Sequence, residues 1–181
     1  MIIETERLII RNFELKDKDN LAEYMLQRVN KEFEAYPDFN LSKLDDEIKR
    51  RIGNEEFYAI ELKSERKVIG NVYLGKRAYN SKELGYVLNE SYQRNGYASE
   101  AGKAVVKWAF AQGLHRIFAE CTPLNIASWK TMEKLGLRRE GELRENITFQ
   151  CDELQNPIYL DTYIYGALAT DNIDHKEDYH K

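Results

Sequence analysis

The sequence has few of the residues and runs that mark the more specialised protein classes. It contains two cysteines and three prolines in 181 residues. No stretch approaches the ~18 consecutive apolar residues of a membrane span. The start, MIIETERLII, carries acids and lacks the basic leader of a secretory signal. We therefore expect no membrane partner and no disulfide-stabilised secreted fold, and we expect the protein in the cytoplasm.

Metal-ligand spacing and an excess of basic residues are also missing. Cys121 and Cys151 lie far apart in the sequence, so we expect free buried thiols and no metal site. The formal net charge is −4, which argues against nucleic acid as a partner, because nucleic-acid binders usually carry a basic excess. The electrostatic field of this net negative charge would attract a cationic ligand.

Length and composition fit one soluble domain. Hydrophobic residues make up 43% and charged residues 32% of the chain, an ordinary balance for a globular protein. We place a single domain at residues 1–170 and an almost wholly polar tail at 171–181. Aromatic residues reach 12%, and this surplus, together with exposed strand edges, is compatible with a homodimer.

Hydrophobic periodicity predicts a mixed α/β chain. Strand-like alternation occupies residues 7–12, 57–62, 68–74, 83–88, 116–121, 143–149 and 158–168. Helical periodicity occupies residues 15–27, 41–52, 98–112 and 125–135. The strand–helix–strand crossover in the middle requires a locally parallel pair. We expect a twisted, mostly antiparallel sheet with one parallel pair and helices on both faces.

A polar loop joins the strand at 83–88 to the clearest helix, at 98–112. The first N–H groups of a helix have no intrahelical partner, and the helix dipole adds positive charge there, so such a junction binds anions. Gly96 lets the backbone approach a ligand, and Arg94 adds a cation nearby. A plain structural turn gives the same pattern, so this junction alone leaves both interpretations open.

The wider sequence around this loop resembles the GNAT superfamily of N-acetyltransferases. Their Q/R-x-x-G-x-G/A signature is matched by Gln93, Arg94, Asn95, Gly96, Tyr97 and Ala98. The ordered segments LGYVL, YQRNGYASEA, HRIFAEC, NIASWKTMEKLGL and REG resemble the branch of ribosomal-protein N-terminal (alanine/serine) acetyltransferases. The likeness is close over residues 83–141 and returns in ETERLIIR and YLDTYIYGAL, but residues 12–56 have little motif support.

This resemblance implies a GNAT-like fold and acetyl-CoA as the bound cofactor. The strand at 84–88 would splay from the parallel strand at 116–121, and the pantetheine arm would pair with free backbone near Tyr86, Val87 and Leu88. The diphosphate would lie on the amides of residues 93–98. Asn125 would contact the pantetheine arm while capping its helix, and Ser128 would protonate the departing thiolate.

The implied reaction is direct attack of a neutral amine on the thioester. At pH 7.4 roughly a quarter of an α-amine is neutral, against about one part in a thousand of a lysine-type amine. Glu83, at the mouth of the splayed strand, is the first candidate for the general base, and a solvated strand-end carboxylate is the alternative interpretation. Asp161 and Glu145 are weaker candidates.

The acceptor stays open between a protein N-terminal α-amine and a small-molecule amine such as a polyamine or aminoglycoside. An aromatic-rich segment with Phe33 and Tyr36 is the candidate substrate-binding region, unless it serves local packing. The alternative function is a non-catalytic acyl-CoA sensor of the same fold. Ser128 favours catalysis, because a sensor needs no proton donor. A dinucleotide-binding domain is disfavoured, because the loop has one glycine.

Overall fold

The structure, a computed structural model, describes residues 2–27, 33 and 39–171. Its strands are β1 (Ile2–Glu4), β2 (Leu8–Asn12), β3 (Phe57–Leu62), β4 (Lys67–Arg77), β5 (Ser81–Leu88), β6 (Arg116–Cys121), β7 (Arg138–Cys151) and β8 (Pro157–Leu168). Its helices are α1 (Lys18–Met25), α3 (Leu44–Ile52), α4 (Tyr97–Ala111) and α5 (Ile126–Lys134), with short 3-10 turns before α1, α3 and α4.

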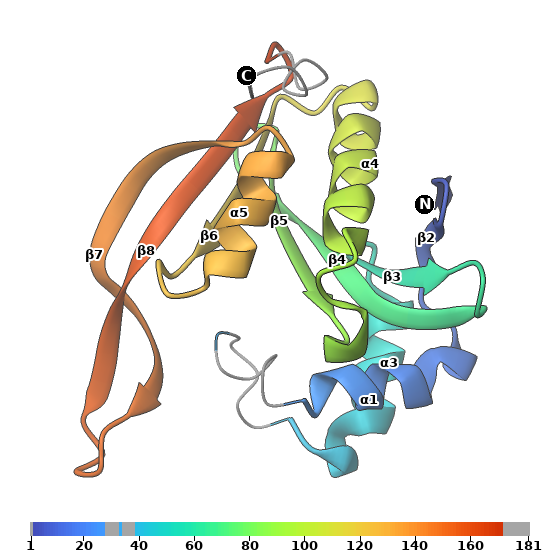
Figure 1. The fold of residues 1–181 in the computed structure, drawn as a ribbon, viewed down its shortest axis with the longest axis horizontal. Helices are drawn as coiled ribbons and strands as arrows, with labels where there is room; N and C mark the ends of the chain where they lie inside the picture. Colours follow the sequence, from blue (N-terminus) through green and yellow to red (C-terminus); the bar gives the residue numbers. More distant parts are fainter. Residues whose placement is uncertain (1, 28–32, 34–38, 172–181) are drawn as a thin grey trace.

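Within these residues the strands form one eight-stranded sheet in the order β1-β2-β3-β4-β5-β6-β8-β7. Helices α4 and α5 lie on one face of the sheet, and α1 and α3 lie on the other (Figure 1). Only β5 and β6 pair in parallel among the strand pairs of the described chain. The expected fold, mostly antiparallel with one parallel pair, is confirmed.

Every strand and helix expected from periodicity is present, with differences at the ends. The sequence missed β1, because a three-residue strand is too short to show a period. It also placed the start of β7 at residue 143, whereas the strand begins at Arg138. Most of β7 is exposed and its pairing with β8 shifts register at three places, so alternation is weak there.

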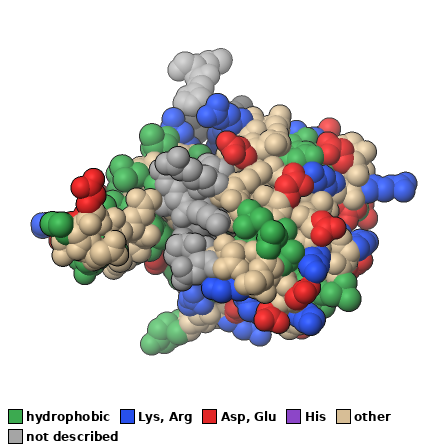
Figure 2. All heavy atoms as spheres, turned by 90° about the horizontal axis from the view of Figure 1, so that it is seen from below, with side chains coloured by type: hydrophobic (Ala, Val, Ile, Leu, Met, Phe, Trp, Pro, Cys, Tyr) green, Lys and Arg blue, Asp and Glu red, His purple; other side chains and the backbone are tan. Residues whose placement is uncertain are grey.

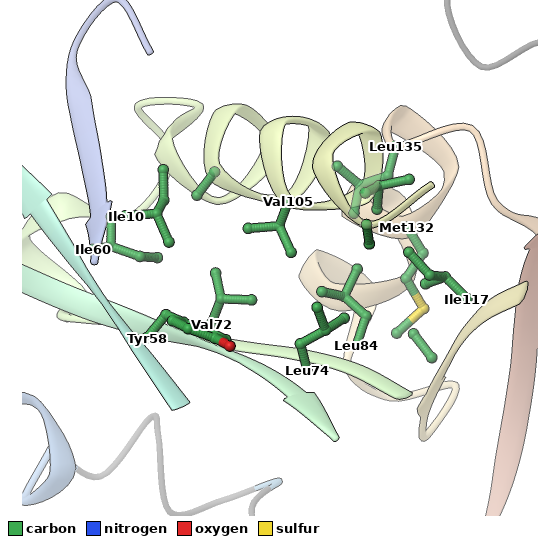
Figure 3. Close-up of a cluster of buried hydrophobic side chains, with 14 of the residues drawn as sticks. Ile10, Tyr58, Ile60, Val72, Leu74, Leu84, Val105, Ile117, Met132 and Leu135 are labelled. Atoms are coloured by element: carbon green, nitrogen blue, oxygen red, sulfur yellow. The ribbon is translucent and has the colours of Figure 1, made fainter. Parts of the chain in front are cut away.

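The larger core lies between α4, α5 and the sheet. Val105 of α4 and Met132 of α5 point toward strand residues that include Val72 and Leu84 (Figure 3). Helix α4 begins after Gly96, whose φ of +81° is left-handed, and its buried side chains recur at Ala101, Val105 and Ala109. A second cluster under α1 and α3 covers the opposite face; its fully buried members are Leu21, Tyr24 and Ala59, with Ile48 almost so.

The parallel pair is short. It joins Ser81 to Arg116, Lys82 to Ile117 and Glu83 to Phe118, and then the two strands part. Strand β5 stays paired with β4 as far as Leu88, and β6 stays paired with β8 as far as Cys121. Each strand is therefore held by its outer neighbour while the inner edges diverge, as Figure 1 shows. The expected splayed pair is confirmed.

Strands β7 and β8 extend beyond the sheet as a long hairpin (Figure 1). Cys151 lies near its tip and is exposed, whereas Cys121 is half-buried, and both are free thiols. The expectation of two buried thiols is thus wrong for Cys151, because β7 is an edge strand with an uncovered face.

The face seen in Figure 2 carries Lys and Arg side chains interspersed with Asp and Glu side chains. No continuous basic surface forms on that view of the described residues. Among the helices of residues 2–27 and 39–171, none is long and apolar enough to cross a membrane.

Gly70 provides a test of how closely β4 and β5 approach. A Cβ at Gly70 would overlap the carbonyl oxygen of Val87 and lie 2.8 Å from Cδ2 of Leu88. Because backbone cannot yield as a side chain does, we expect Gly70→Ala to destabilise the protein by about 1–3 kcal/mol in urea unfolding. The matched control is Gly141→Ala, also in a strand, where a Cβ meets nothing within 4 Å. Its effect should stay within about 0.5 kcal/mol; equal effects would contradict the close approach.

Candidate active site

Beside the gap between β5 and β6, a tyrosine of β5 bonds to the first turn of α5. The hydroxyl of Tyr86 donates to the carbonyl oxygen of Ser128 at 2.8 Å and lies 3.4 Å from Ser128 Oγ. Ser128 sits in the first turn of α5, and its amide donates to the side chain of Asn125, the N-cap, at 3.2 Å. The expected capping role of Asn125 is confirmed. Three predicted site residues therefore meet on the α5 side of the gap.

Burial favours the protonated forms of two side chains in this gap. It raises the pKa of the Tyr86 hydroxyl, which the bond to Ser128 only partly offsets. Burial likewise raises the pKa of the Cys121 thiol to about 11, with Ser128 again opposing. Both groups are protonated at neutral pH. Cys121 is therefore not a thiolate nucleophile.

The loop after β5 has the backbone geometry of an anion site. Arg94 and Gly96 both have left-handed backbone, with φ of +62° and +81°, an arrangement that turns amides toward one side, as in anion-binding nests. In the described part of the chain, the amides of residues 94–98 donate to no protein acceptor. The side chain of Gln93 donates to Leu88 O at 3.2 Å, and that of Asn95 donates to Gln93 O at 3.0 Å. These bonds fix the loop around its free N–H groups.

The sequence did not predict that the turn before β2 also bonds to this loop and to α4. The Arg7 guanidinium donates to Asn95 O at 3.1 Å and pairs with Glu100 of α4 at 2.6 Å. Glu100 also accepts from the Thr5 hydroxyl at 2.5 Å. Burial alone would raise the pKa of Glu100, but the bonds from Thr5 and Arg7 outweigh it and lower the pKa. The turn between β1 and β2 thus holds the start of α4.

On the α1 and α3 side, the gap opens into a cavity of about 490 Å³. Four predicted residues line it, namely Phe33, Glu83, Tyr86 and Val87. Tyr36 lies outside the described residues, and Leu88 is buried, so only its backbone faces the gap. The other lining residues come from α3, the α3–β3 loop, and strands β3 to β8: Arg50, Asn54, Glu56, Phe57, Asn71, Tyr73, Arg77, Leu84, Gly85, Glu120, Cys121, Ile147, Phe149 and Thr162.

Two carboxylates face this cavity from the parted strands. The Glu83 carboxylate is bonded by the guanidinium of Arg77. Glu120 of β6 is exposed to the cleft, yet burial by the cavity walls and the nearby Glu83 carboxylate raise its pKa, with Arg77 opposing. Sequence reasoning did not select Glu120. The available signal was alternation in β6, where Ile117 and Ala119 are buried.

The two weaker base candidates lie in the hairpin and do not line the cavity. Asp161 accepts a hydrogen bond from the backbone amide of Glu145 at 2.8 Å. Glu145 has a left-handed φ of +48°, inside one of the register shifts between β7 and β8. Asp161 therefore stabilises an irregular part of the β7–β8 hairpin.

Comparison with known proteins agrees with this geometry. Residues 7–138 match the model of the Acetyltransferase (GNAT) domain. The chain is 37% identical over 182 residues to the uncharacterised N-acetyltransferase YnaD of Bacillus subtilis (strain 168), covering 93% of this chain and 97% of that protein. The GNAT-family acetyltransferase structure from Bacillus anthracis superposes with a TM-score of 0.85 at 32% identity, covering 94% of this chain and all of that one.

A more distant structure is that of RimL, a ribosomal L7/L12 α-N-protein acetyltransferase in complex with coenzyme A. It has a TM-score of 0.78 at 19% identity and covers 93% of this chain and 98% of that one, which shows a shared fold. The expected likeness to the ribosomal-protein branch is confirmed by the ribosomal protein uS5-alanine N-acetyltransferase of Escherichia coli (strain K12), which is 26% identical over 160 residues and covers 79% of this chain and 81% of that protein. With the domain match over most of the chain and the YnaD alignment over nearly its full length, the chain belongs to the GNAT family of N-acetyltransferases.

Proposed function

We propose that the protein transfers an acetyl group from acetyl-CoA to an amine, either a protein N-terminal α-amine or the amine of a small molecule. The carrying observation is that β5 parts from β6 and leads into a loop in which the amides of residues 94–98 have no acceptor in the described chain. An extended ligand with amide groups and a terminal diphosphate matches both features. RimL, of the same fold, was solved with coenzyme A, which supports this donor.

Different residues would bind different parts of acetyl-CoA. The amides of residues 94–98, with Arg94, take the diphosphate, and the inner edge of β5 near Tyr86, Val87 and Leu88 takes the pantetheine arm. Asn125 adds a side-chain contact to that arm beside its capping bond. Acetyl-CoA supplies an activated thioester. Ser128 and Tyr86, both on the α5 side of the gap, are placed to protonate the leaving thiolate.

We assign the general base to Glu120 from its position in the cavity and its raised pKa. The attacking amine forms a C–N bond as the C–S bond breaks, so one proton must leave the nitrogen. Glu120 has a raised pKa and faces the cavity, whereas the carboxylate of Glu83 is engaged by Arg77. A raised pKa brings a carboxylate closer to the strength needed for amine deprotonation, directly or through one water. Glu83 stays the alternative base.

The cavity also favours catalysis over a sensor function. A sensor of acyl-CoA needs one ligand site, whereas this protein has a cavity on the opposite face of the gap in which three acids line the wall with two arginines, Arg50 and Arg77. Its walls include Phe33, Phe57 and Tyr73, and its acids include Glu56, Glu83 and Glu120. Such a cavity attracts an amine attached to a partly apolar group.

The donor site is tested by titration calorimetry of acetyl-CoA. We expect wild type to bind and Gly96→Asp to lose at least roughly tenfold in affinity, because the new carboxylate would lie where the diphosphate binds. Gly113→Asp is the matched control, since Gly113 has a similar φ of +84° and a Cβ there meets nothing within 4 Å. It carries the same backbone strain at the far end of α4 and should bind normally. Absence of binding by wild type would overturn the proposed donor.

The acceptor is then sought by thiol release with an N-terminal peptide, spermidine and kanamycin. Turnover of the peptide places the protein with the modifiers of protein N-termini. Turnover of spermidine or kanamycin places it with the modifiers of small amines. Binding of acetyl-CoA without release of thiol in the presence of any amine would support the sensor alternative.

The base is tested by the pH dependence of kcat/KM. A general base works when ionised, so activity should fall as the pH drops through the pKa of Glu120, which lies above the ordinary glutamate value. Glu120→Gln should lower kcat by about 10²–10⁴-fold and remove this acidic limb. Glu83→Gln, a matched change in the same cavity, should keep the limb. If Glu83→Gln removes it and Glu120→Gln does not, Glu83 is the base.

A further inference from the structure

Asn71 is a buried amide at the floor of the acceptor cavity. It lies in β4, is 3% exposed, and lines the cavity from the α1 and α3 face of the sheet. Its partner across the strand pair is Val87 of β5, within the stretch to which we assign the pantetheine arm. Asparagine is rarely buried without a polar role.

The orientation of this amide is fixed by its neighbours. Its Oδ1 accepts from the Tyr24 hydroxyl at 2.9 Å and from Nη1 of Arg51 at 2.9 Å. A guanidinium only donates hydrogen bonds, so the oxygen of Asn71 must be the atom that faces Arg51. The NH₂ group therefore points the other way.

That NH₂ group has no protein acceptor among the described residues. The side-chain hydrogen bonds of Asn71 in this part of the chain all end on Oδ1. No buried side-chain nitrogen or oxygen of a described residue is both sealed from solvent and unpaired. Nδ2 must therefore reach the cavity surface, where a ligand can accept its hydrogen bond.

The support behind Asn71 is rigid. Arg51 is 2% exposed, donates to Glu47 at 2.7 Å, and lies 4.7 Å over the ring of Phe57. Rotation of the amide would place its NH₂ against this cation and break two buried hydrogen bonds. The fold thus presents one fixed donor to the cavity, and a buried donor of this kind rejects a ligand that offers no acceptor.

We propose that Asn71 Nδ2 donates a hydrogen bond to a carbonyl or carboxylate oxygen that lies next to the amine of the acceptor. The inference rests on the proposed function. Cα atoms paired across antiparallel strands lie only ~5 Å apart, so an amine attacking near Val87 places an oxygen three bonds from its nitrogen within reach of Asn71. The acceptor is then an α-aminoacyl compound, which carries such an oxygen, and not a polyamine, which has none.

The test compares two peptide acceptors that differ in their first peptide group. One is a tetrapeptide with a free N-terminal alanine, and the other has an E-alkene in place of its first peptide bond, which keeps the shape and removes the carbonyl oxygen and the amide N–H; rates are compared per neutral amine. We expect wild type to prefer the normal peptide by about tenfold or more in kcat/KM. This comparison requires no mutant and stands even if a variant fails to fold.

Asn71→Asp is the matching variant, because it keeps an oxygen for Tyr24 and Arg51 and removes the NH₂ donor. We expect it to lose the preference for the normal peptide, mainly through KM, with unchanged affinity for acetyl-CoA by calorimetry. Asn54→Asp is the control. Asn54 lines the same cavity and accepts from the Glu56 amide at 2.8 Å, so this change adds the same charge while Asn71 stays intact. It should keep the preference.

The outcomes separate the two proposals. If no amine is acetylated, the proposed function fails and the role of Asn71 fails with it. If amines are acetylated but wild type uses both peptides equally, or Asn71→Asp keeps the preference, only the role of Asn71 is overturned. A loss of acetyl-CoA affinity in Asn71→Asp would mean that the donor faces the cofactor, which also overturns the inference.

Discussion

The site depends on one constraint, which is that β5 and β6 must stay in one sheet and yet separate past Glu83 and Phe118. Each strand keeps its outer partner, while past Glu83 and Phe118 the described residues of the two inner edges no longer pair with each other. An unpaired inner edge is unstable in a sheet unless something covers it. Tyr86 and the start of α5 cover it on one face, and the open cavity lies on the other.

This separation assigns the two reactants to different faces. The α4 and α5 side supplies a helix terminus and the loop of residues 94–98, both suited to a long anion. The α1 and α3 side supplies Glu83, Glu120 and aromatic walls, which suit an amine. In the proposed function the two ligands meet at the gap, where the amine reaches the thioester.

The parts of the site that the sequence predicted are local in the chain. Gly96, Ser128 and Asn125 belong to short motifs in which neighbours along the chain decide the backbone, and the structure has them as expected. Periodicity gave the helices and central strands for the same reason. The splayed pair came from family resemblance, because no local pattern records where two distant strands stop pairing.

The parts that the sequence did not predict depend on contacts between distant segments. Arg7 and Glu100 are bonded although they lie 93 residues apart in the sequence. Asn71 takes its orientation from Tyr24 and Arg51, which lie on two different helices. In the sequence Arg51 is one of several charged residues of an exposed-looking helix. Its burial under Phe57 emerges only when α3 packs on the sheet. Glu120 was hidden likewise, since alternation shows which face it occupies but not what lies there.

The β7–β8 hairpin can change in sequence more freely than the central core. It contributes Ile147, Phe149 and Thr162 to the acceptor cavity, yet much of it projects beyond the sheet, and β7 is paired only with β8 among the described strands. Substitutions or insertions in such a ribbon leave the central core undisturbed. Under the proposed function, changes in this peripheral wall would alter the amine that is recognised and leave the proposed donor site unchanged.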